Sequence, residues 1–388
     1  MMTKRSRLHL SFIAVWVVSL LISTAAAGEE NTVSRAPATN AQAASLIDVK
    51  SGRILYSHQG DAEMPVASLT KIMTAIVAIE HGKLDEKVSV SKHAYRKEGS
   101  SIYLELGEEM TLENMLYGLM LRSGNDAATA IAEHVGGSEE GFVHLMNEKV
   151  KMLGLKHTRF QNPHGLDAKG HYSSANDLAV ITAYSLKNPI FKEIVKTQTK
   201  KAPNPNHPWD YKWDNKNKML RFYEGADGVK TGYTKIARRC LVSSASRAGQ
   251  QLAVVTLNDG DDWNDHQKLL DYGFAHFPLQ QIIEDRQPVE NGLVTGAGFS
   301  YALAGGEYER IERKLLLQNA RANAFGYRGH IKISLDGQEI GRVPVYEQGS
   351  FIPSPDVNPR LSANIKPAWR SAFAAVIKSL LLIDHVKS

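Results

Sequence analysis

Three short patterns in the sequence combine residue types that could catalyse acyl transfer. In chain order they are Ser68-Leu69-Thr70-Lys71, Ser123-Gly124-Asn125 and Lys230-Thr231-Gly232. A serine hydroxyl is a poor nucleophile until a base removes its proton. A lysine can be that base only if burial and a neighbouring cation lower its pKa. Lys71 begins an apolar stretch and Lys230 could supply the second positive charge, so the two lysines could activate Ser68 and attract a substrate carboxylate.

Local context separates the first pattern from its chance copies. The patterns recur at Ser89 to Lys92, Ser174 to Asn176, Ser362 to Asn364 and Lys50 to Gly52. Ser68, however, opens an apolar run at 68–79 that predicts a buried helix, with Ser68 and Lys71 one turn apart on one face. The N-terminus of that helix favours negative charge developing on Ser68. We therefore predict a Ser68–Lys71 hydrogen bond with Lys230 nearby.

The other two patterns are predicted to lie where side chains can enter a cleft. Ser123-Gly124-Asn125 falls in a tight break between two helices. Lys230 is predicted to start a strand, and Gly232 in that strand would let another backbone or a ligand approach closely. The structural prediction is that all three patterns converge on one site.

The elements that must position these patterns follow from hydrophobic periodicity and helix caps. Further helices are predicted at 111–121, 125–134, 138–153, 174–186 and 265–276, the first, third and fourth of them capped by Thr111, Ser138 and Ser174. A hairpin is predicted at 44–56, strands at 240–244 and 251–257, and a loop at 203–218. Together they form a helical cluster flanked by strands. The stretch 280–350 predicts a small β-rich domain, whose hairpin at 331–346 turns at Asp336-Gly337.

Composition and charge exclude several classes of protein. The 388 residues include 46 Lys and Arg against 41 Asp and Glu, which is ordinary for a globular protein of two or three domains. The single cysteine, Cys240, excludes an intrachain disulfide and is predicted to be a buried small hydrophobe. No metal-binding or nucleotide-binding motif occurs, so we expect no cofactor, no metal ion and no nucleic-acid partner. Several histidines are predicted to be surface or loop residues: His134, His144, His157 and His164.

Both ends of the chain are predicted to have targeting roles. Lys4, Arg5 and Arg7 precede an apolar run and Ala25-Ala26-Ala27, which predicts a signal peptide at 1–27 and an exported protein. A tether at 28–42 follows it. At the other end, a Pro-rich linker at 351–367 leads to a tail at 368–388. We expect this tail to be an amphipathic helix on the outer face of the cytoplasmic membrane, or of the membrane around a forespore, the alternative being a helix packed on its own domain. Its apolar residues recur at helical spacing: Trp369, Phe373, Val376, Ile377, Leu380 and Leu381.

The longer strings around the three patterns resemble a known family. PVASLTKIMTA, YGLMLRSGNDAATAIAEHVGG, FQNPHGLD and GVKTGYT are similar to strings of the low-molecular-weight penicillin-binding proteins, which are serine-type D-alanyl-D-alanine carboxypeptidases. The resemblance implies an α/β fold. A β-lactamase/transpeptidase-like catalytic domain at 43–279, with an antiparallel sheet flanked by helices, would precede a small all-β domain at 280–350 and the C-terminal helix. LNDGDDWNDH, at 257–266, resembles the branch of Gram-positive spore formers whose members trim spore-cortex peptidoglycan.

The resemblance implies a catalytic sequence. Ser68 attacks the carbonyl of the penultimate D-Ala of a peptidoglycan stem ending in D-Ala-D-Ala, Lys71 takes its proton, and Ser123 relays a proton to the leaving amine. The backbone N–H groups of Ser68 and Tyr233 form the oxyanion hole, although some relatives have His at the position of Tyr233. Water then hydrolyses the acyl-enzyme, whereas β-lactam antibiotics mimic the dipeptide and trap Ser68.

The resemblance also implies a set of binding residues. Asn125 hydrogen-bonds the substrate amide. Lys230 and Thr231 hold the terminal carboxylate, with Gly232 beside them. Some relatives add an Arg for that carboxylate, but the matching stretch here, 261–266, contains no Arg.

Other functions are weighed against the carboxypeptidase. A class A β-lactamase adds a deacylating Glu between the second and third patterns, where this chain has only Asp167 and Asp177 as acidic residues in FQNPHGLDAKGHYSSANDL. Fast β-lactam hydrolysis is therefore not expected, while cleavage of D,D-crosslinks by an endopeptidase stays open. A non-enzymatic module that binds peptidoglycan or β-lactams would have an inert site, and the presence of every named side chain argues against it.

Overall fold

The computed structural model describes residues 36–318 and 326–352 of the chain. The predicted signal peptide, most of the tether, most of the Pro-rich linker and the whole predicted tail lie outside the described residues. Within the described ranges, no helix has both the length and the apolar character needed to cross a bilayer.

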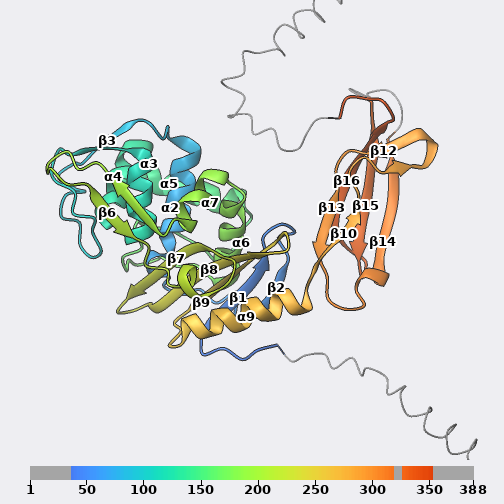
Figure 1. Ribbon diagram of the computed structural model, residues 1–388, viewed down its shortest axis with the longest axis horizontal. Helices are drawn as coiled ribbons and strands as arrows, with labels where there is room; N and C mark the ends of the chain where they lie inside the picture. The colour runs from blue at the N-terminus through green and yellow to red at the C-terminus, as the bar shows by residue number, and fades with distance from the viewer. Residues whose placement is uncertain (1–35, 319–325, 353–388) are drawn as a thin grey trace, which may run out of the picture. The chain divides into compact units, whose positions relative to one another are not determined.

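A five-stranded antiparallel sheet lies at the centre of the part of the chain that contains the three patterns, in the order β2-β1-β9-β8-β7 (Figure 1). It brings the N-terminal hairpin beside three strands that follow it by more than 150 residues, because β1 pairs with β9 along its whole length. The predicted hairpin and the two predicted strands are thereby confirmed. The strands are β1 (Ala43–Asp48), β2 (Ile54–His58), β7 (Ala226–Thr234), β8 (Arg238–Arg247) and β9 (Gln250–Leu257).

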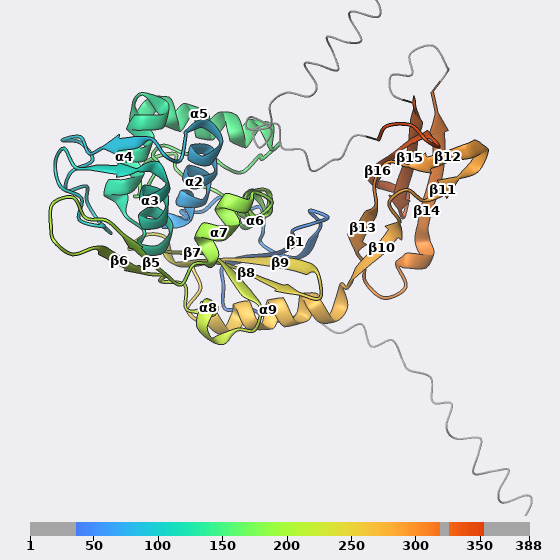
Figure 2. The same cartoon turned by 45° about the horizontal axis from the view of Figure 1, so that its top comes forward.

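Helices cover both faces of this sheet (Figure 2). Side chains alternate along β9, so that Ala253 and Val255 join the large core under the helical cluster, whereas Leu252 and Val254 face α9 (Asp262–His276). Within the cluster lies α2 (Thr70–His81), in which every residue from Thr70 to Ile79 is buried. The remaining helices are α3 (Leu112–Tyr117), α4 (Asn125–Gly136), α5 (Glu139–Met152), α6 (Ala175–Leu186), α7 (Pro189–Lys196) and α8 (Met219–Phe222).

The helix starts that the caps predict are confirmed. The Thr111 hydroxyl accepts a hydrogen bond from the backbone N–H of Asn114 at the start of α3. Ser138 and Ser174 cap α5 and α6 in the same way. These bonds satisfy backbone donors that a helix N-terminus otherwise leaves free.

Two local predictions are wrong. The stretch 203–218 is not all loop, because β6 (Tyr211–Asp214) pairs with β5 (Thr199–Ala202), and the ribbon buries Trp213. Lys230 does not start a strand, since β7 already begins at Ala226. In both places long-range pairing extends a strand into a stretch rich in Asn, Pro, Gly or Asp.

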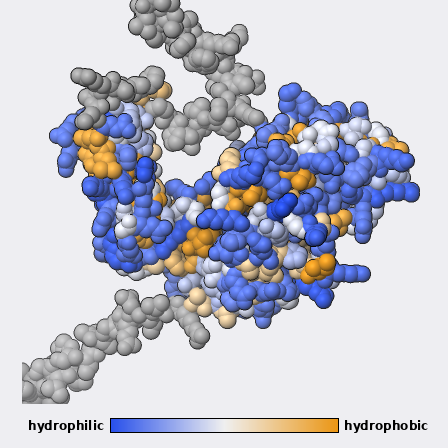
Figure 3. All heavy atoms as spheres, turned by 180° about the vertical axis from the view of Figure 1, so that it is seen from behind, coloured by the Kyte–Doolittle hydropathy of each residue, from blue (hydrophilic) through white to orange (hydrophobic). Residues whose placement is uncertain are grey.

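The stretch after α9 contains strands and short 3-10 turns. Antiparallel β10 and β13 form one ribbon, and the order β11-β12-β16-β15-β14 forms a second sheet, with Asp336 and Gly337 at the β15–β16 turn as predicted. On the face of the protein in Figure 3, hydrophobic side chains reach the surface in small separate groups. The strands are β10 (Leu279–Ile283), β11 (Pro288–Val289), β12 (Leu293–Thr295), β13 (Phe299–Ala302), β14 (Ile311–Leu317), β15 (Tyr327–Leu335) and β16 (Gln338–Glu347). A further ribbon, in the helical cluster, pairs β3 (Lys87–Ser89) with β4 (Glu109–Thr111).

Candidate active site

Ser68 lies in a short 3-10 turn, η1 (Ala67–Leu69), that leads directly into α2. Its hydroxyl accepts a hydrogen bond of 3.0 Å from Lys71 Nζ, so the predicted Ser68–Lys71 bond is confirmed. Lys71 is completely buried, which excludes a lysine whose charge reaches solvent. Ser68 therefore lies at the edge of the helical core with a buried amine beside it.

The amine of Lys71 is held by two further acceptors. It donates to Asn125 Oδ1 at 2.7 Å and to the backbone carbonyl of His164 at 2.5 Å. Burial lowers its pKa well below the usual lysine value, and the positive charges of Lys230 and Lys216 lower it further. A lysine that loses its proton in this way can accept one from Ser68.

Ser123 sits in the predicted break between two helices. The chain leaves α3 through a single π-helical turn, η2 (Gly118–Arg122), and Ser123 then adopts a left-handed backbone with φ of 68°. Such turns interrupt helices frequently at functional sites. The Ser123 hydroxyl is buried and has no hydrogen-bond partner within the described residues. This is costly for the fold, because a buried polar group without a partner destabilises a protein by about 1–3 kcal/mol.

Asn125 connects the break between the two helices to the loop at 98–104 through hydrogen bonds. Its Nδ2 donates to the carbonyl of Glu98 at 2.6 Å and its backbone N–H to the carbonyl of Ser100 at 2.7 Å, while its Oδ1 accepts from Lys71. The next residue, Asp126, is buried and fixes the same loop through the backbone N–H groups of Ile102 and Leu104. The sequence analysis did not select Asp126, although an acidic residue in the first turn of a helix was a usable signal.

Lys230 lies in the middle of β7 and is almost completely buried. Its Nζ donates to the carbonyl of Thr231 at 2.8 Å. Burial, followed by the charge of Lys216, lowers the pKa of Lys230 to about 7. A Cβ on Gly232 would lie 3.2 Å from the backbone nitrogen of Ser68, which confirms the predicted close approach of another backbone. Beyond it, the Tyr233 side chain is exposed.

Lys216 is a third cation of the site, and sequence reasoning missed it. It follows the β5–β6 ribbon, its backbone N–H donates to the carbonyl of Leu121, and its Nζ donates to Ser100 Oγ at 3.4 Å. It lowers the pKa of both Lys71 and Lys230. Nothing in the local sequence distinguishes it, since Lys212, Lys216 and Lys218 all lie in the same Lys- and Asn-rich stretch.

The stretch 161–171 packs directly against the turn that carries Ser68. Gly165 has φ of +84°, and a Cβ there would lie 1.9 Å from the carbonyl oxygen of Ala67, so only glycine fits. His171 Nδ1 accepts from the backbone of Gln161, which leaves Nε2 to donate to Thr70 Oγ1 at 2.8 Å. Burial, with a contribution from Lys71, lowers the pKa of His171 to about 4, so the ring is neutral near pH 7.

Two other predictions for single residues have different outcomes. His164 lies in a loop, as predicted, but it is not at the surface, because the contact of its carbonyl with Lys71 draws it into the core. Cys240 is buried as predicted, and burial raises its pKa to about 12.

The chance copies of the patterns have structural roles instead. Ser174 caps α6, Ser89 is the exposed last residue of β3, and Lys50 lies in the β1–β2 turn. Ser362 lies outside the described residues. In the part of the chain that the structure describes, no cluster of three or more His, Cys, Asp or Glu could hold a metal ion.

Sequence comparison relates this site to a characterised family. The family model of D-alanyl-D-alanine carboxypeptidase matches residues 30–261. The D-alanyl-D-alanine carboxypeptidase DacF of Bacillus subtilis is 39% identical over 65% of this chain and 67% of its own length. The D-alanyl-D-alanine carboxypeptidase DacC of Escherichia coli is 32% identical over 90% of this chain and 95% of its own length.

Solved structures give the same relationship. Penicillin-binding protein 5 of Haemophilus influenzae aligns with a TM-score of 0.66 and 27% identity, over 81% of this chain and 98% of its own. A D-alanyl-D-alanine carboxypeptidase of Mycobacterium tuberculosis aligns with a TM-score of 0.59 and 32% identity, over 63% of this chain and 94% of its own. The predicted α/β fold with an antiparallel sheet flanked by helices is confirmed.

Proposed function

Because the chain belongs to the D-alanyl-D-alanine carboxypeptidase family, we propose that Ser68 carries the acyl-enzyme through which it removes the terminal D-Ala from peptidoglycan stem peptides. The main support for this proposal is the contact between Ser68 and Lys71. The only buried amine that contacts the Ser68 hydroxyl, among the described residues, belongs to Lys71, and two neighbouring cations lower the pKa of that amine.

Acylation starts with the transfer of the Ser68 proton to neutral Lys71. The Ser68 oxygen then bonds to the carbonyl carbon of the penultimate D-Ala. Negative charge develops on the carbonyl oxygen, where the backbone N–H groups of Ser68 and Tyr233 stabilise it. The close approach of Gly232 to the Ser68 backbone supports this pairing of the two N–H groups.

Breakdown of the tetrahedral intermediate requires a proton on the leaving amine. Ser123 passes on to it the proton that Lys71 took from Ser68, and the buried Ser123 hydroxyl, which no group in the described ranges engages, is free for that relay. The bond between the carbonyl carbon and the terminal D-Ala nitrogen breaks, and D-Ala leaves. Lys71 then takes a proton from water as the water oxygen bonds to the ester carbonyl carbon. The bond from that carbon to Ser68 Oγ breaks, and Lys71 returns the proton to Ser68, which restores the starting state.

Substrate recognition uses the charge that the site holds. Lys230 and Thr231 bind the terminal carboxylate, and Lys216 adds positive charge in a chain that lacks an Arg at 261–266. Asn125 has both groups of its amide engaged, but its Oδ1 retains a second lone pair for the substrate amide. A β-lactam presents the same carboxylate and carbonyl, so it acylates Ser68 as an inhibitor.

We further propose that the protein is exported and that residues 368–388 attach it to the outer face of the membrane. The charged and apolar pattern at the N-terminus and the amphipathic spacing of the tail support this location. We also propose a role in the spore cortex, because the 257–266 stretch resembles the branch of Gram-positive spore formers. Fractionation of cells that express the full chain or a variant ending at 352 tests the attachment, since loss of the tail should release the protein from the membrane fraction.

Mass spectrometry of the protein mixed with penicillin, beside a Ser68→Ala variant, tests the proposed function. We expect a stable adduct on Ser68 and none on the variant, with D-Ala released from a diacyl-D-Ala-D-Ala peptide. Rapid turnover of the antibiotic would instead indicate a β-lactamase. An adduct without D-Ala release would indicate a β-lactam-binding module. Correctly folded protein that forms no adduct would contradict the assignment of Ser68.

A further inference from the structure

The His164 ring is a buried polar group that the catalytic steps do not use. The residue is 4% exposed, and its Nε2 has no hydrogen-bond partner among the described residues. Its Nδ1 accepts a hydrogen bond of 3.3 Å from the backbone N–H of Leu166, so the proton of the neutral ring is on Nε2. Burial, followed by the charge of Lys71, lowers the pKa of His164 to about 3, which keeps the ring neutral near pH 7.

Glu139 faces this buried N–H group. Its Oε1 lies 3.7 Å from His164 Nε2, which is an electrostatic contact just beyond hydrogen-bond length. Glu139 belongs to the first turn of α5, where the helix N-terminus favours its negative charge. Its other oxygen, Oε2, accepts from His93 Nε2 at 3.0 Å and from Lys97 Nζ at 3.3 Å. These two contacts engage Oε2 and leave Oε1 for the His164 ring.

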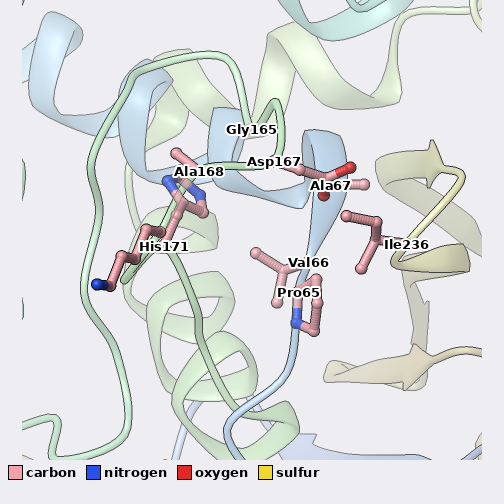
Figure 4. Close-up of a pocket in the computed structure, with 9 residues that line it drawn as sticks. Pro65, Val66, Ala67, Gly165, Asp167, Ala168, His171 and Ile236 are labelled. Carbon is pink, nitrogen blue, oxygen red and sulfur yellow. The ribbon is translucent and has the colours of Figure 1, made fainter.

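The backbone of the same histidine holds the base of the proposed mechanism. The His164 carbonyl accepts a hydrogen bond from Lys71 Nζ at 2.5 Å. The next residue, Gly165, lies against Ala67 in the turn that carries Ser68 (Figure 4). A shift of this carbonyl would therefore change the direction of the Lys71 amine relative to the Ser68 hydroxyl.

Two sets of contacts determine where that carbonyl points. Asn162 Oδ1 accepts from the backbone N–H groups of His164 and Gly165, which fixes the chain on one side of the carbonyl. The ring fixes the residue on its other side, and in the described ranges its polar contacts are with Leu166 and Glu139. Loss of Glu139 leaves the buried N–H with no facing oxygen, and a ring that turns toward another acceptor moves the attached backbone.

We propose that Glu139 is a positioning residue for acylation, which acts through the His164 ring to hold the carbonyl that orients the Lys71 amine. The inference rests on the proposed function and adds a residue to it. The reach of Glu139 matters more than its charge, because an acceptor oxygen of any kind satisfies a neutral N–H donor. If Glu139 served only as the counter-charge of Lys97, its charge would matter and its reach would not.

The test compares the second-order rate constant of acylation by penicillin in two variants that separate reach from charge. Glu139→Asp keeps the charge but is one methylene shorter. We expect it to lower the rate constant by about tenfold, since a misplacement of about 1 Å at an active site can cost about 100-fold. Glu139→Gln keeps an acceptor oxygen at full reach without the charge, and should retain the wild-type rate constant. Glu140→Asp is the matched control, because Glu140 is the next residue of the same first turn and is exposed. It should leave the rate constant unchanged.

A double variant tests the path through the histidine. His164→Ala removes the ring but keeps the backbone carbonyl, so it should lower the rate constant to a similar extent. Glu139→Asp added to His164→Ala should cause no further loss, because two residues that act through one contact are not additive. Thermal denaturation shows whether each variant is folded at the assay temperature. If His164→Ala is not folded, the comparison of Glu139→Asp with Glu139→Gln decides alone.

The outcomes separate this role from the function on which it rests. A rate constant that survives Glu139→Asp would overturn the positioning role. An equal loss in Glu139→Gln would also overturn it and would indicate the ion pair with Lys97 instead. Additive losses in the double variant would contradict the path through His164. In each of these cases the wild-type protein still forms the adduct on Ser68. If the wild-type protein forms no adduct, the proposed function fails and the positioning role fails with it.

Discussion

The Ser123→Ala variant is expected to be more stable than the wild-type protein and nearly inactive. The Ser123 hydroxyl is buried without a partner among the described residues, and such a group costs the fold about 1–3 kcal/mol. Alanine removes that cost while the left-handed backbone stays as it is. At the lower end of the range, the free energy of unfolding rises by about 1 kcal/mol, which raises Tm by about 2 °C in a domain of this size. Loss of the proton relay should lower kcat for D-Ala release by about 100-fold or more.

Ser174→Ala is the matched control for this prediction. Ser174 is also buried and also belongs to an S-x-N pattern, but its hydroxyl caps α6 by accepting from the backbone N–H of Asp177 at 3.1 Å. Its loss should lower stability by about 1 kcal/mol and leave D-Ala release unchanged. Thermal denaturation should therefore give shifts of opposite sign for the two variants, and only Ser123→Ala should lose D-Ala release. If both variants lose the same stability, the Ser123 hydroxyl has a partner in solution and the reasoning is refuted.

Three further predictions follow from the charges and the packing of the site. Lys216→Gln should move the acid limb of penicillin acylation to higher pH, because removing this cation raises the pKa of Lys71; a limb that stays in place would contradict the electrostatic role. Lys230 has a pKa of about 7 when folded and 10.5 when free, so the unfolded chain binds the extra proton and the free energy of unfolding rises with pH from about 7 upward. Lys230→Met should flatten that rise by about 1.4 kcal/mol per pH unit in chemical denaturation between about pH 7 and 9, and an unchanged slope would show that Lys230 stays protonated in the folded protein. Gly165→Ala should impair both folding and acylation, whereas Gly170→Ala, which has the same sign of φ but meets only one flexible side chain, should cost about 1–2 kcal/mol and retain acylation; equal effects in the two variants would mean that the contact with the Ser68 turn is unimportant.

The parts of the fold that depend on local chemistry could be predicted from the sequence. The caps at Thr111, Ser138 and Ser174 locate helix starts because a side-chain oxygen and a backbone N–H three residues apart interact without help from the rest of the chain. The apolar run after Ser68 indicates a central helix for a similar reason, since only a buried helix is apolar on all sides. The Ser68–Lys71 contact follows from helix geometry alone.

The features that long-range contacts create could not be predicted. Strand β6 forms in a Pro- and Asn-rich stretch because β5 pairs with it and because Trp213 is buried there. Lys216 belongs to the site only because that ribbon carries it to Ser100, more than 100 residues earlier. His171 and Gly165 are likewise defined by their contact with the Ser68 turn. A single sequence contains no periodic signal for such contacts, which explains why Lys216, His171 and Gly165 were missed.

The unfavourable features of this molecule are concentrated around one hydroxyl group. Two buried lysines have lowered pKa values, a buried serine lacks a partner among the described residues, and both Ala67 and Ser123 have positive φ angles. Each feature destabilises the fold, and together they could not persist on an exposed or frayed helix. They persist here because α2 is buried along nearly its whole length. The packing around α2 fixes the position of Lys71, so its amine cannot move toward solvent. The same burial that makes the lysine a poor structural residue lowers its pKa, as the proposed role of Lys71 as a base requires.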